Sequence, residues 1–250
     1  MPRRAILFDL DGTLMDHDAA RESGLVAHLA QWLPEAEPED LARLNGEWRR
    51  LEALHYDEYT AGLCSFTEQR RRRVQGLHAS LGRTGPSEVE ADAWFARYLQ
   101  RYRSAWRPFD DVSPMLVALA SSHGEAVLGV VTNGEGGPQR AKLAAIGLAE
   151  SFSVVVASGE VGLAKPDPAI FALACERLGV KPEQAAHVGD RLDLDARAAA
   201  SAGLLGVWLD RPGASNRESM MMTATPSTSM QEPGVSRIAT LEELPGALGL

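Results

Sequence analysis

Two carboxylates, Asp9 and Asp11, follow directly on a short apolar run near the start of the chain. An apolar run of this length that leads into Asp-x-Asp-Gly-Thr predicts a buried strand ending in a tight turn. Alternate residues of an extended chain share a face, so the two carboxylates can converge on one point. Two like charges at such a short distance need a cation between them or a shared proton. The plainer alternative is an Asp-rich turn that caps the next helix.

Further polar groups stand at the carboxyl ends of three later predicted strands. They are Thr132 and Asn133 after 126–131, Lys165 in the loop after 153–157, and Asp190, Asp193 and Asp195 after 185–188. Taken singly, they are explained as a turn, a solvated lysine and charges that favour a helix N-terminus. Ligands of open parallel sheets, however, bind at the carboxyl ends of the strands, so we expect the groups to share one site.

The residue types in this shared site suit a phosphorylated ligand. Thr132, Asn133 and the backbone freed by the following glycine can form an anion-binding nest, and Lys165 supplies a positive charge. The carboxylates can hold a hard cation, and oxygen ligands without a His or Cys cluster select Mg²⁺ over zinc. A carboxylate beside a bound Mg²⁺ can attack phosphorus and form an aspartyl-phosphate.

The elements that must position these groups alternate from residue 112 onward between strands and helices of 10–12 residues. This rhythm predicts an α/β fold with a Rossmann-like, doubly wound parallel sheet. Residues 16–107 instead show helical spacing and no strand pattern, which predicts an all-helical cap domain inserted after the first strand. The α/β core domain then comprises 1–15 and 108–250.

A segment at 212–234 departs from this rhythm, because it is rich in Ser, Thr, Pro and Met and poor in large apolar residues. It cannot bury much surface, so we expect a mobile loop within the core. The alternative is a Met-rich contact surface that adapts to a partner.

Bulk properties exclude several classes of partner. The net charge of −9 argues against non-specific binding to nucleic acid or to an anionic membrane surface. The sequence contains no run of 18 apolar residues, so we expect no membrane span. Only a strand-length apolar run follows the charged N-terminal residues, so we expect no secretory signal. Two cysteines, Cys64 and Cys175, stand far apart without metal-ligand spacing, which favours a reducing compartment and hence the cytoplasm. The oligomeric expectation is a monomer or a homodimer.

The motifs, taken in order, resemble those of the haloacid dehalogenase-like hydrolase superfamily, in its branch with a helical cap after the first strand. The resemblance covers nearly the whole chain from Ala5 to about Asp210 and resumes near Ile238. It implies that Asp9 is the nucleophile and a metal ligand. It also implies that Asp11 is the general acid and base, and that its backbone carbonyl ligates the metal.

The same resemblance assigns roles to the later motifs. Thr132, with Asn133 beside it, would bind the phosphoryl oxygens. Lys165 would offset the charge of nucleophile and phosphate. Asp190 would ligate Mg²⁺ directly and Asp195 indirectly, while Asp193 has no strong role in the family.

The function expected from these roles is a Mg²⁺-dependent phosphatase that acts on a small phosphorylated substrate, a sugar phosphate or a nucleoside monophosphate. The alternatives are a phosphomutase of the same fold, a haloacid dehalogenase and a non-catalytic binding protein. Dehalogenation needs no acid to protonate a leaving alcohol, so Asp11 argues against it. The complete set of motif residues argues against a binding protein.

Specificity would come from residues outside the motifs. His17, Glu135 and Gln139 are candidates for the mouth of the cleft. The run Arg70–Arg73 invites a second anion site, but four successive helical residues point in four directions, so we predict a solvated face. Four of the five tryptophans lie within 16–107, where helical spacing favours a core role.

Overall fold

The computed structural model describes residues 4–122, 126–212 and 232–250. The chain divides into two compact units, one of residues 1–16 with 107–250 and the other of residues 17–106. The expected loop at 212–234 falls mostly on residues 213–231, which lie outside the described residues. No helix in the described ranges is long and apolar enough to cross a bilayer.

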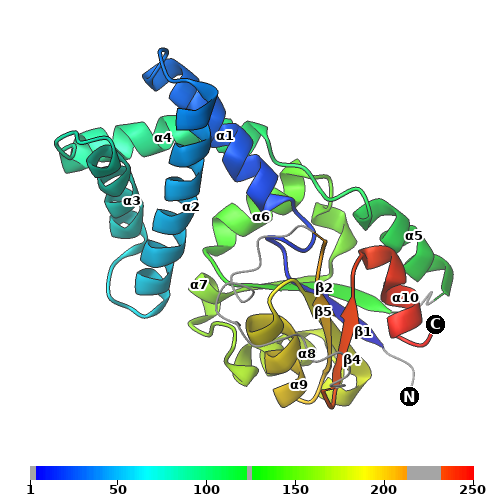
Figure 1. Ribbon diagram of the computed structural model, residues 1–250. Helices are drawn as coiled ribbons and strands as arrows, with labels where there is room; N and C mark the ends of the chain where they lie inside the picture. The colour runs from blue at the N-terminus through cyan, green and yellow to red at the C-terminus, as the bar shows by residue number, and fades with distance from the viewer. Residues whose placement is uncertain (1–3, 123–125, 213–231) are drawn as a thin grey trace. The chain divides into compact units, whose positions relative to one another are not determined.

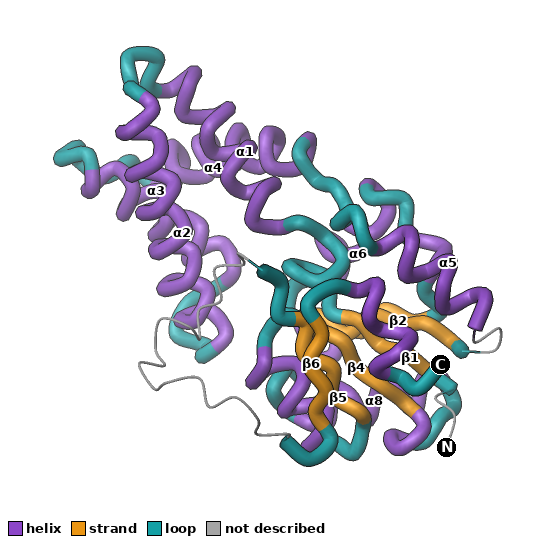
Figure 2. Tube along the Cα trace, turned by 45° about the vertical axis from the view of Figure 1, so that its right-hand side comes forward, coloured by secondary structure: helices purple, strands orange, loops and turns teal. Residues whose placement is uncertain are grey.

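The first unit is built on a six-stranded sheet in which all paired strands are parallel (Figures 1 and 2). The strand order is β3-β2-β1-β4-β5-β6. The strands are β1 (Ala5–Phe8), β2 (Val127–Thr132), β3 (Val154–Ala157), β4 (Ala185–Gly189), β5 (Leu205–Leu209) and β6 (Val235–Ile238). The α/β, doubly wound fold class predicted from the sequence is confirmed.

Helices cover the faces of this sheet. They are α5 (Val112–Ser122), α6 (Gly136–Ala145), α7 (Ser158–Val161), α8 (Pro168–Leu178), α9 (Ala198–Ser201) and α10 (Leu244–Ala247). Leu7 of β1 belongs to a buried cluster with Phe171 of α8 and Ala199 of α9. Alternate strand residues face opposite sides, so Ile6 and Phe8 supply the other face. Complete burial on both faces explains why β1 is a continuous apolar run.

The register of the central strands brings their carboxyl ends to one level. Phe8 of β1 lies opposite Val130 of β2 and Val188 of β4. Asp9 continues β1 by donating its backbone N–H to the Val188 carbonyl at 2.8 Å. The residues that follow these three strands therefore meet at one edge of the sheet.

The second unit consists of four helices, α1 (His17–Trp32), α2 (Pro38–Thr60), α3 (Phe66–Ser80) and α4 (Glu88–Ser104). Ser65 caps α3 and Ser87 forms a capping box with Glu90 at the start of α4. Trp48 and Trp94 are buried and lie 5.2 Å apart between ring centroids. Aromatic side chains thus form the core of this unit.

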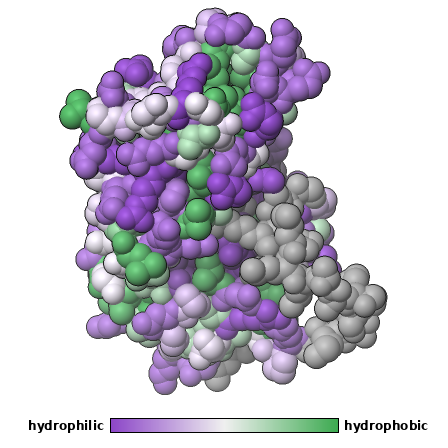
Figure 3. Space-filling view, turned by 60° about the vertical axis from the view of Figure 1, so that its left-hand side comes forward, coloured by the Kyte–Doolittle hydropathy of each residue, from purple (hydrophilic) through white to green (hydrophobic). Residues whose placement is uncertain are grey.

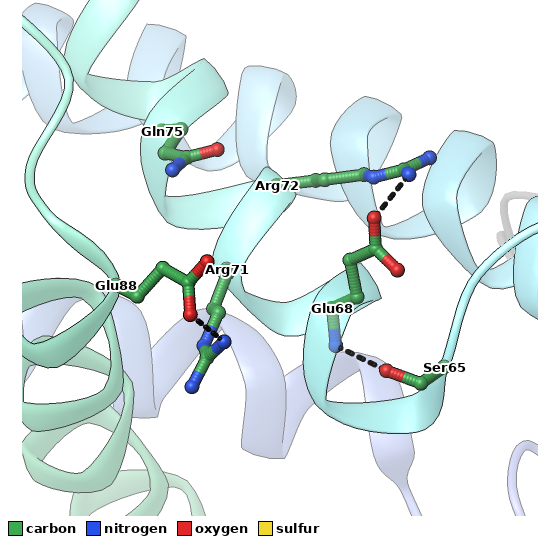
Figure 4. Close-up of a pocket in the computed structure, with 6 residues that line it drawn as sticks. All are labelled: Ser65, Glu68, Arg71, Arg72, Gln75 and Glu88. Atoms are coloured by element: carbon green, nitrogen blue, oxygen red, sulfur yellow. Dashed lines mark hydrogen bonds and ion pairs between the residues drawn. The ribbon is translucent and has the colours of Figure 1, made fainter.

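The predicted solvated face at Arg70–Arg73 is wrong for Arg73, which is 5% exposed. Its guanidinium pairs with Glu52 at 2.7 Å and lies over the Trp48 ring. Because consecutive residues point around a helix, one of the four had to face the core. Arg71 and Arg72 pair with Glu88 and Glu68 and line a pocket on α3 (Figure 4).

Hydrophilic residues predominate on the face of the molecule drawn in Figure 3, and the exposed apolar residues form separate patches. The most exposed large apolar side chains include Leu63, Val89 and Val117. Single apolar side chains of this kind are normal on a protein surface.

Candidate active site

A buried lysine joins two of the predicted acids at the sheet edge. The Lys165 ammonium donates to Asp9 Oδ1 at 2.5 Å and to Asp195 Oδ1 at 2.6 Å. All three residues are at most 6% exposed. Burial acts to lower the pKa of Lys165, but the charges of Asp195 and Asp9 outweigh it and raise that pKa. Lys165 therefore stays protonated in the folded protein.

The loop that carries Lys165 is held by Asn133. The Asn133 side chain donates to the Lys165 carbonyl at 2.9 Å and accepts from the Lys165 backbone N–H at 2.8 Å. Both ends of the Asn133 amide thus bind the Lys165 backbone. From the end of β2, Asn133 therefore holds the loop that carries Lys165 in place.

Three acids gather as a candidate cation site. Carboxylate oxygens of Asp9, Asp190 and Asp195 lie within 4.8 Å of one another. Asp190 Oδ1 is buried and has no hydrogen-bond partner among the described residues. A Cβ at Gly12 would come within 2.7 Å of Asp190 Oδ2, so the glycine leaves room for this carboxylate. An orphaned carboxylate oxygen among other acids fits a hard divalent cation.

The electrostatics of the three acids differ. Burial raises the pKa of Asp9 to about 6, although Lys165 acts against it. Burial and the charges of Asp9 and Asp195 raise the pKa of Asp190. Burial also acts to raise the pKa of Asp195, but Lys165 and a hydrogen bond from His187 hold it below its ordinary value. Asp9 and Asp190 thus bear the unfavourable charge that a cation would relieve.

Asp195 is already occupied on both oxygens. Oδ1 accepts from Lys165 and from His187 Nε2 at 3.0 Å, and Oδ2 accepts from the Arg191 backbone N–H at 3.0 Å. The carboxylate arrives there from η3 (Leu192–Arg197), a π-helical turn where the sequence predicts an α-helix from Asp193. Asp193 itself is exposed and pairs with Arg197.

Asp11 is held by two residues of α6. Lys142 Nζ lies 2.7 and 2.6 Å from the two Asp11 carboxylate oxygens, and Gln139 Nε2 donates to Asp11 Oδ2 at 3.1 Å. Lys142 is 8% exposed and Gln139 3%. Gln139 was expected at the mouth of the cleft and is instead buried, because α6 turns residues 139 and 142 toward Asp11 on one face.

Gln139 also determines how Thr132 can act. Its Nε2 lies 2.6 Å from Thr132 Oγ1, and the Asp11 carboxylate beside it accepts only, so the amide must donate to both. Since the Thr132 oxygen is used as an acceptor, its own O–H remains available as a donor. The arrangement can therefore present a hydroxyl proton to a phosphoryl oxygen.

Three further residues support the site. His187 lies inside β4 and Thr13 accepts from the Asp190 backbone N–H at 3.1 Å. Trp208 of β5 donates its indole N–H to the Asp190 carbonyl at 3.2 Å. The scarcity of lysine was a signal for Lys142, and Thr13 belongs to the Asp-x-Asp-Gly-Thr run, but no local pattern marked His187 or Trp208.

Two other candidates from the sequence are His17 and Glu135. His17 belongs to the helical unit, where Nδ1 lies 2.8 Å from the Tyr102 hydroxyl and Nε2 lies 3.6 Å from Glu52. Glu135 is half-buried at the N-cap position of α6, and its side chain makes no cap hydrogen bond there.

Comparisons with known proteins agree with this geometry. The family model for haloacid dehalogenase-like hydrolases matches residues 3–203. A phosphoserine phosphatase of Thermus thermophilus is 33% identical over 83% of this chain and 89% of its own. A glyceraldehyde 3-phosphate phosphatase of Methanopyrus kandleri is 32% identical over 83% and 84%. The crystal structure of a HAD-hydrolase from Bacillus subtilis bound to magnesium superposes with a TM-score of 0.76, at 21% identity over the full length of both chains.

Proposed function

Because this chain belongs to the haloacid dehalogenase-like hydrolase family, we propose that it hydrolyses a small phosphorylated metabolite with Mg²⁺ and an aspartyl-phosphate intermediate at Asp9. It is a hydrolase that acts on phosphoric monoesters. One observation carries the finer proposal. The buried Asp9 carboxylate is bound by Lys165 and lies within 4.8 Å of a carboxylate oxygen of Asp190, whose Oδ1 has no hydrogen-bond partner among the described residues.

The proposed cation would be held by Asp9, the Asp11 backbone carbonyl and Asp190, with Asp195 acting at one remove. When bound, Mg²⁺ supplies positive charge that neutralises the carboxylates and the phosphoryl oxygens. Asp195 suits the indirect role because Lys165, His187 and a backbone N–H already engage its oxygens. The oxygen-only donor set supports Mg²⁺ over softer metals.

In the first half-reaction, an Asp9 carboxylate oxygen attacks phosphorus and the bond from phosphorus to the leaving oxygen breaks. Asp11 gives a proton to that oxygen, so the product leaves as an alcohol. Lys165 offsets the negative charge around Asp9, and the Thr132 hydroxyl donates to a phosphoryl oxygen. Asp11 is the feature that favours phosphate transfer over dehalogenation, which has no alkoxide to protonate.

In the second half-reaction, Asp11 takes a proton from water, and the resulting hydroxide attacks phosphorus. The acyl-phosphate bond breaks, inorganic phosphate leaves and the Asp9 carboxylate is restored. One acid and base thus serves both halves. Most of the rate enhancement comes from positioning and charge neutralisation, as phosphoryl transfer requires.

We assign the helical unit 17–106 as the cap that selects the substrate. The named relatives act on phosphoserine and glyceraldehyde 3-phosphate, which are both small phosphorylated metabolites. Sugar phosphates and nucleoside monophosphates are therefore the first classes to test. The core motifs recognise the phosphate that such molecules share, whereas the rest of each molecule must be read by other residues.

The test is phosphate release from a panel of phosphomonoesters, with Mg²⁺ or with a chelator, by the wild type and by Asp9→Asn. We expect Asp9→Asn to lose activity by at least about 10³-fold, because removal of a nucleophile is among the costliest catalytic changes. Asp193→Asn is the matched control, since Asp193 is exposed and lies outside the acid cluster. A wild type that releases phosphate from no phosphomonoester would refute the proposal.

A further inference from the structure

We propose that Lys142 is a positioning residue that aims the Asp11 carboxyl group at the leaving oxygen. The inference rests on the proposed function and deepens it. Lys142 contacts both oxygens of Asp11, at 2.7 and 2.6 Å, from a position that is 8% exposed. An ammonium that reaches both oxygens holds the carboxyl group in place, and the Gln139 amide on Oδ2 distinguishes one oxygen from the other.

The choice of lysine supports a dedicated role. The chain has 25 Lys and Arg residues, yet lysine occurs only at Lys142, Lys165 and Lys181. Two of these three bind the two aspartates of the first motif, Lys142 with Asp11 and Lys165 with Asp9. An ammonium group is a compact charge with rotatable donors, which suits a partner that must exchange contacts during a reaction better than a planar guanidinium does.

The surroundings of Asp11 restrict it further. Gln139, three residues before Lys142 on α6, donates to Asp11 Oδ2 at 3.1 Å and to Thr132 Oγ1 at 2.6 Å. The proton donor is thereby linked to the hydroxyl that would bind the phosphoryl group. Replacement of Lys142 removes the ammonium from Asp11 but leaves the hydrogen bonds of Gln139 to Asp11 and Thr132 in place.

A direct role of Lys142 on the phosphoryl group is the competing interpretation. Lys165 already supplies an ammonium at the nucleophile, and the Lys142 ammonium lies on both Asp11 oxygens. The two interpretations differ in what they predict for the leaving group. Loss of a phosphoryl contact slows all phosphomonoesters alike, whereas a misplaced acid slows only those whose leaving oxygen needs a proton.

The experiment compares kcat/KM for two substrates. The glycerol leaving group of β-glycerophosphate departs as an unstable alkoxide unless it is protonated, whereas the phenolate of p-nitrophenyl phosphate leaves without a proton. For Lys142→Met we expect a fall of about 10²-fold with β-glycerophosphate and of less than about 5-fold with p-nitrophenyl phosphate. Asp11→Asn sets the largest ratio that loss of the acid can give. The value of kcat/KM reports only the steps up to departure of the alcohol. It therefore does not include the later hydrolysis of the aspartyl-phosphate, in which Asp11 acts as the base.

The ratio of the two kcat/KM values does not depend on how much of the protein is folded. Lys142→Gln, a polar replacement, is expected to shift the ratio in the same direction should Lys142→Met be insoluble. Lys181→Met is the matched control, because Lys181 is exposed, and it should leave the ratio unchanged. An unchanged ratio in the Lys142 variants would overturn the inference while the proposed function stands. A wild type inactive on both phosphates would overturn both.

Discussion

Lys165 carries the charge balance of the site, because it is the shared partner of Asp9 and Asp195. A fourth group, the Asp190 carboxylate, lacks such a partner on Oδ1. The protein thus compensates two buried acids with its own cation and leaves one for an external cation. Burial raises the pKa of Asp9 even with Lys165 beside it and raises the pKa of Asp190, whereas Lys165 and His187 together hold the pKa of Asp195 low.

His28 in α1 provides a test of buried charge within the helical unit. It is 4% exposed and packs edge-on against Trp94, with 4.3 Å between ring centroids. Burial, with the charges of Arg97 and Arg101, lowers its pKa from 6.5 to about 4. The unfolded chain therefore takes up this proton first as the pH falls, and the folded protein loses stability between about pH 6.5 and 4.

We expect the wild type to lose about 1–3 kcal/mol of unfolding free energy between pH 7.5 and 4.5 relative to His28→Leu. Leucine has no proton to bind, so the variant lacks this contribution and the comparison cancels the titration of other groups. Urea unfolding followed by tryptophan fluorescence at the two pH values measures the difference. Parallel pH dependence of the two proteins would contradict the expectation.

The sequence predicts residues best where their position follows from a strand end. Asp9 and Asp190 meet because parallel strands end together, whereas Asp195 reaches them through the π-helical turn η3. Lys142 and His187 could not be found this way. Each lies inside an element, and which side chains it meets depends on how helices and strands pack across the sheet.

Helices α1 and α4 of the helical unit approach each other closely at Gly24. A Cβ added at Gly24 of α1 would lie 2.6 Å from the Tyr102 Cα of α4. Glycine at this point allows the two backbones to approach, at the usual cost in helix propensity. The crossing is thus fixed by a residue that a propensity argument alone would regard as unfavourable.

We predict opposite effects for two glycine-to-alanine substitutions in this unit. Gly24→Ala should lower the unfolding free energy by about 1–3 kcal/mol, because the new methyl group meets backbone that cannot move independently. Gly46→Ala in α2 should raise it by up to about 1 kcal/mol, since no described atom lies within 4 Å of its added Cβ. Thermal and urea unfolding of both variants give the comparison. Equal effects of the two substitutions would contradict the predicted crossing.

Element types were easier to predict than their local geometry. The Ser-x-x-Glu spacings that start at Ser65 and Ser87 predict helix starts, and a helix begins after each serine. The sequence did not predict the π-helical turn η3, because it arises from packing. A Cβ at Gly189 would lie 2.2 Å from Asp195 Cγ, so the wide turn and the glycine together let this carboxylate lie against β4.

For the molecule as a whole, the two chain crossings between the units lie side by side. The Asp16 backbone N–H donates to the Arg107 carbonyl at 3.1 Å, and Met15 pairs with Pro108 in an antiparallel bridge. A short linker can therefore join Asp16 to Arg107 without disturbing the sheet. The fold class followed from the alternation of strands and helices, but the strand order depends on long-range packing that a single sequence does not display.

We predict that a chain with residues 17–106 replaced by a short Gly-Ser linker folds and binds Mg²⁺. Its kcat/KM values for different phosphomonoesters should lie within about tenfold of one another, because the residues that discriminate are removed. Circular dichroism and a substrate panel, each compared with the full chain, provide the measurement. Retention of the full chain's substrate preferences would contradict the role assigned to the helical unit.

The sparing use of lysine has a practical consequence for labelling. Lys142 and Lys165 are 8% and 6% exposed and their amines are engaged by carboxylates, whereas Lys181 stands exposed. An amine-reactive dye will therefore acylate Lys181 in preference to the other two lysine side chains. The folded enzyme carries a natural attachment point for a fluorophore or a biosensor surface, and the ammonium groups of Lys142 and Lys165 are shielded from the reagent.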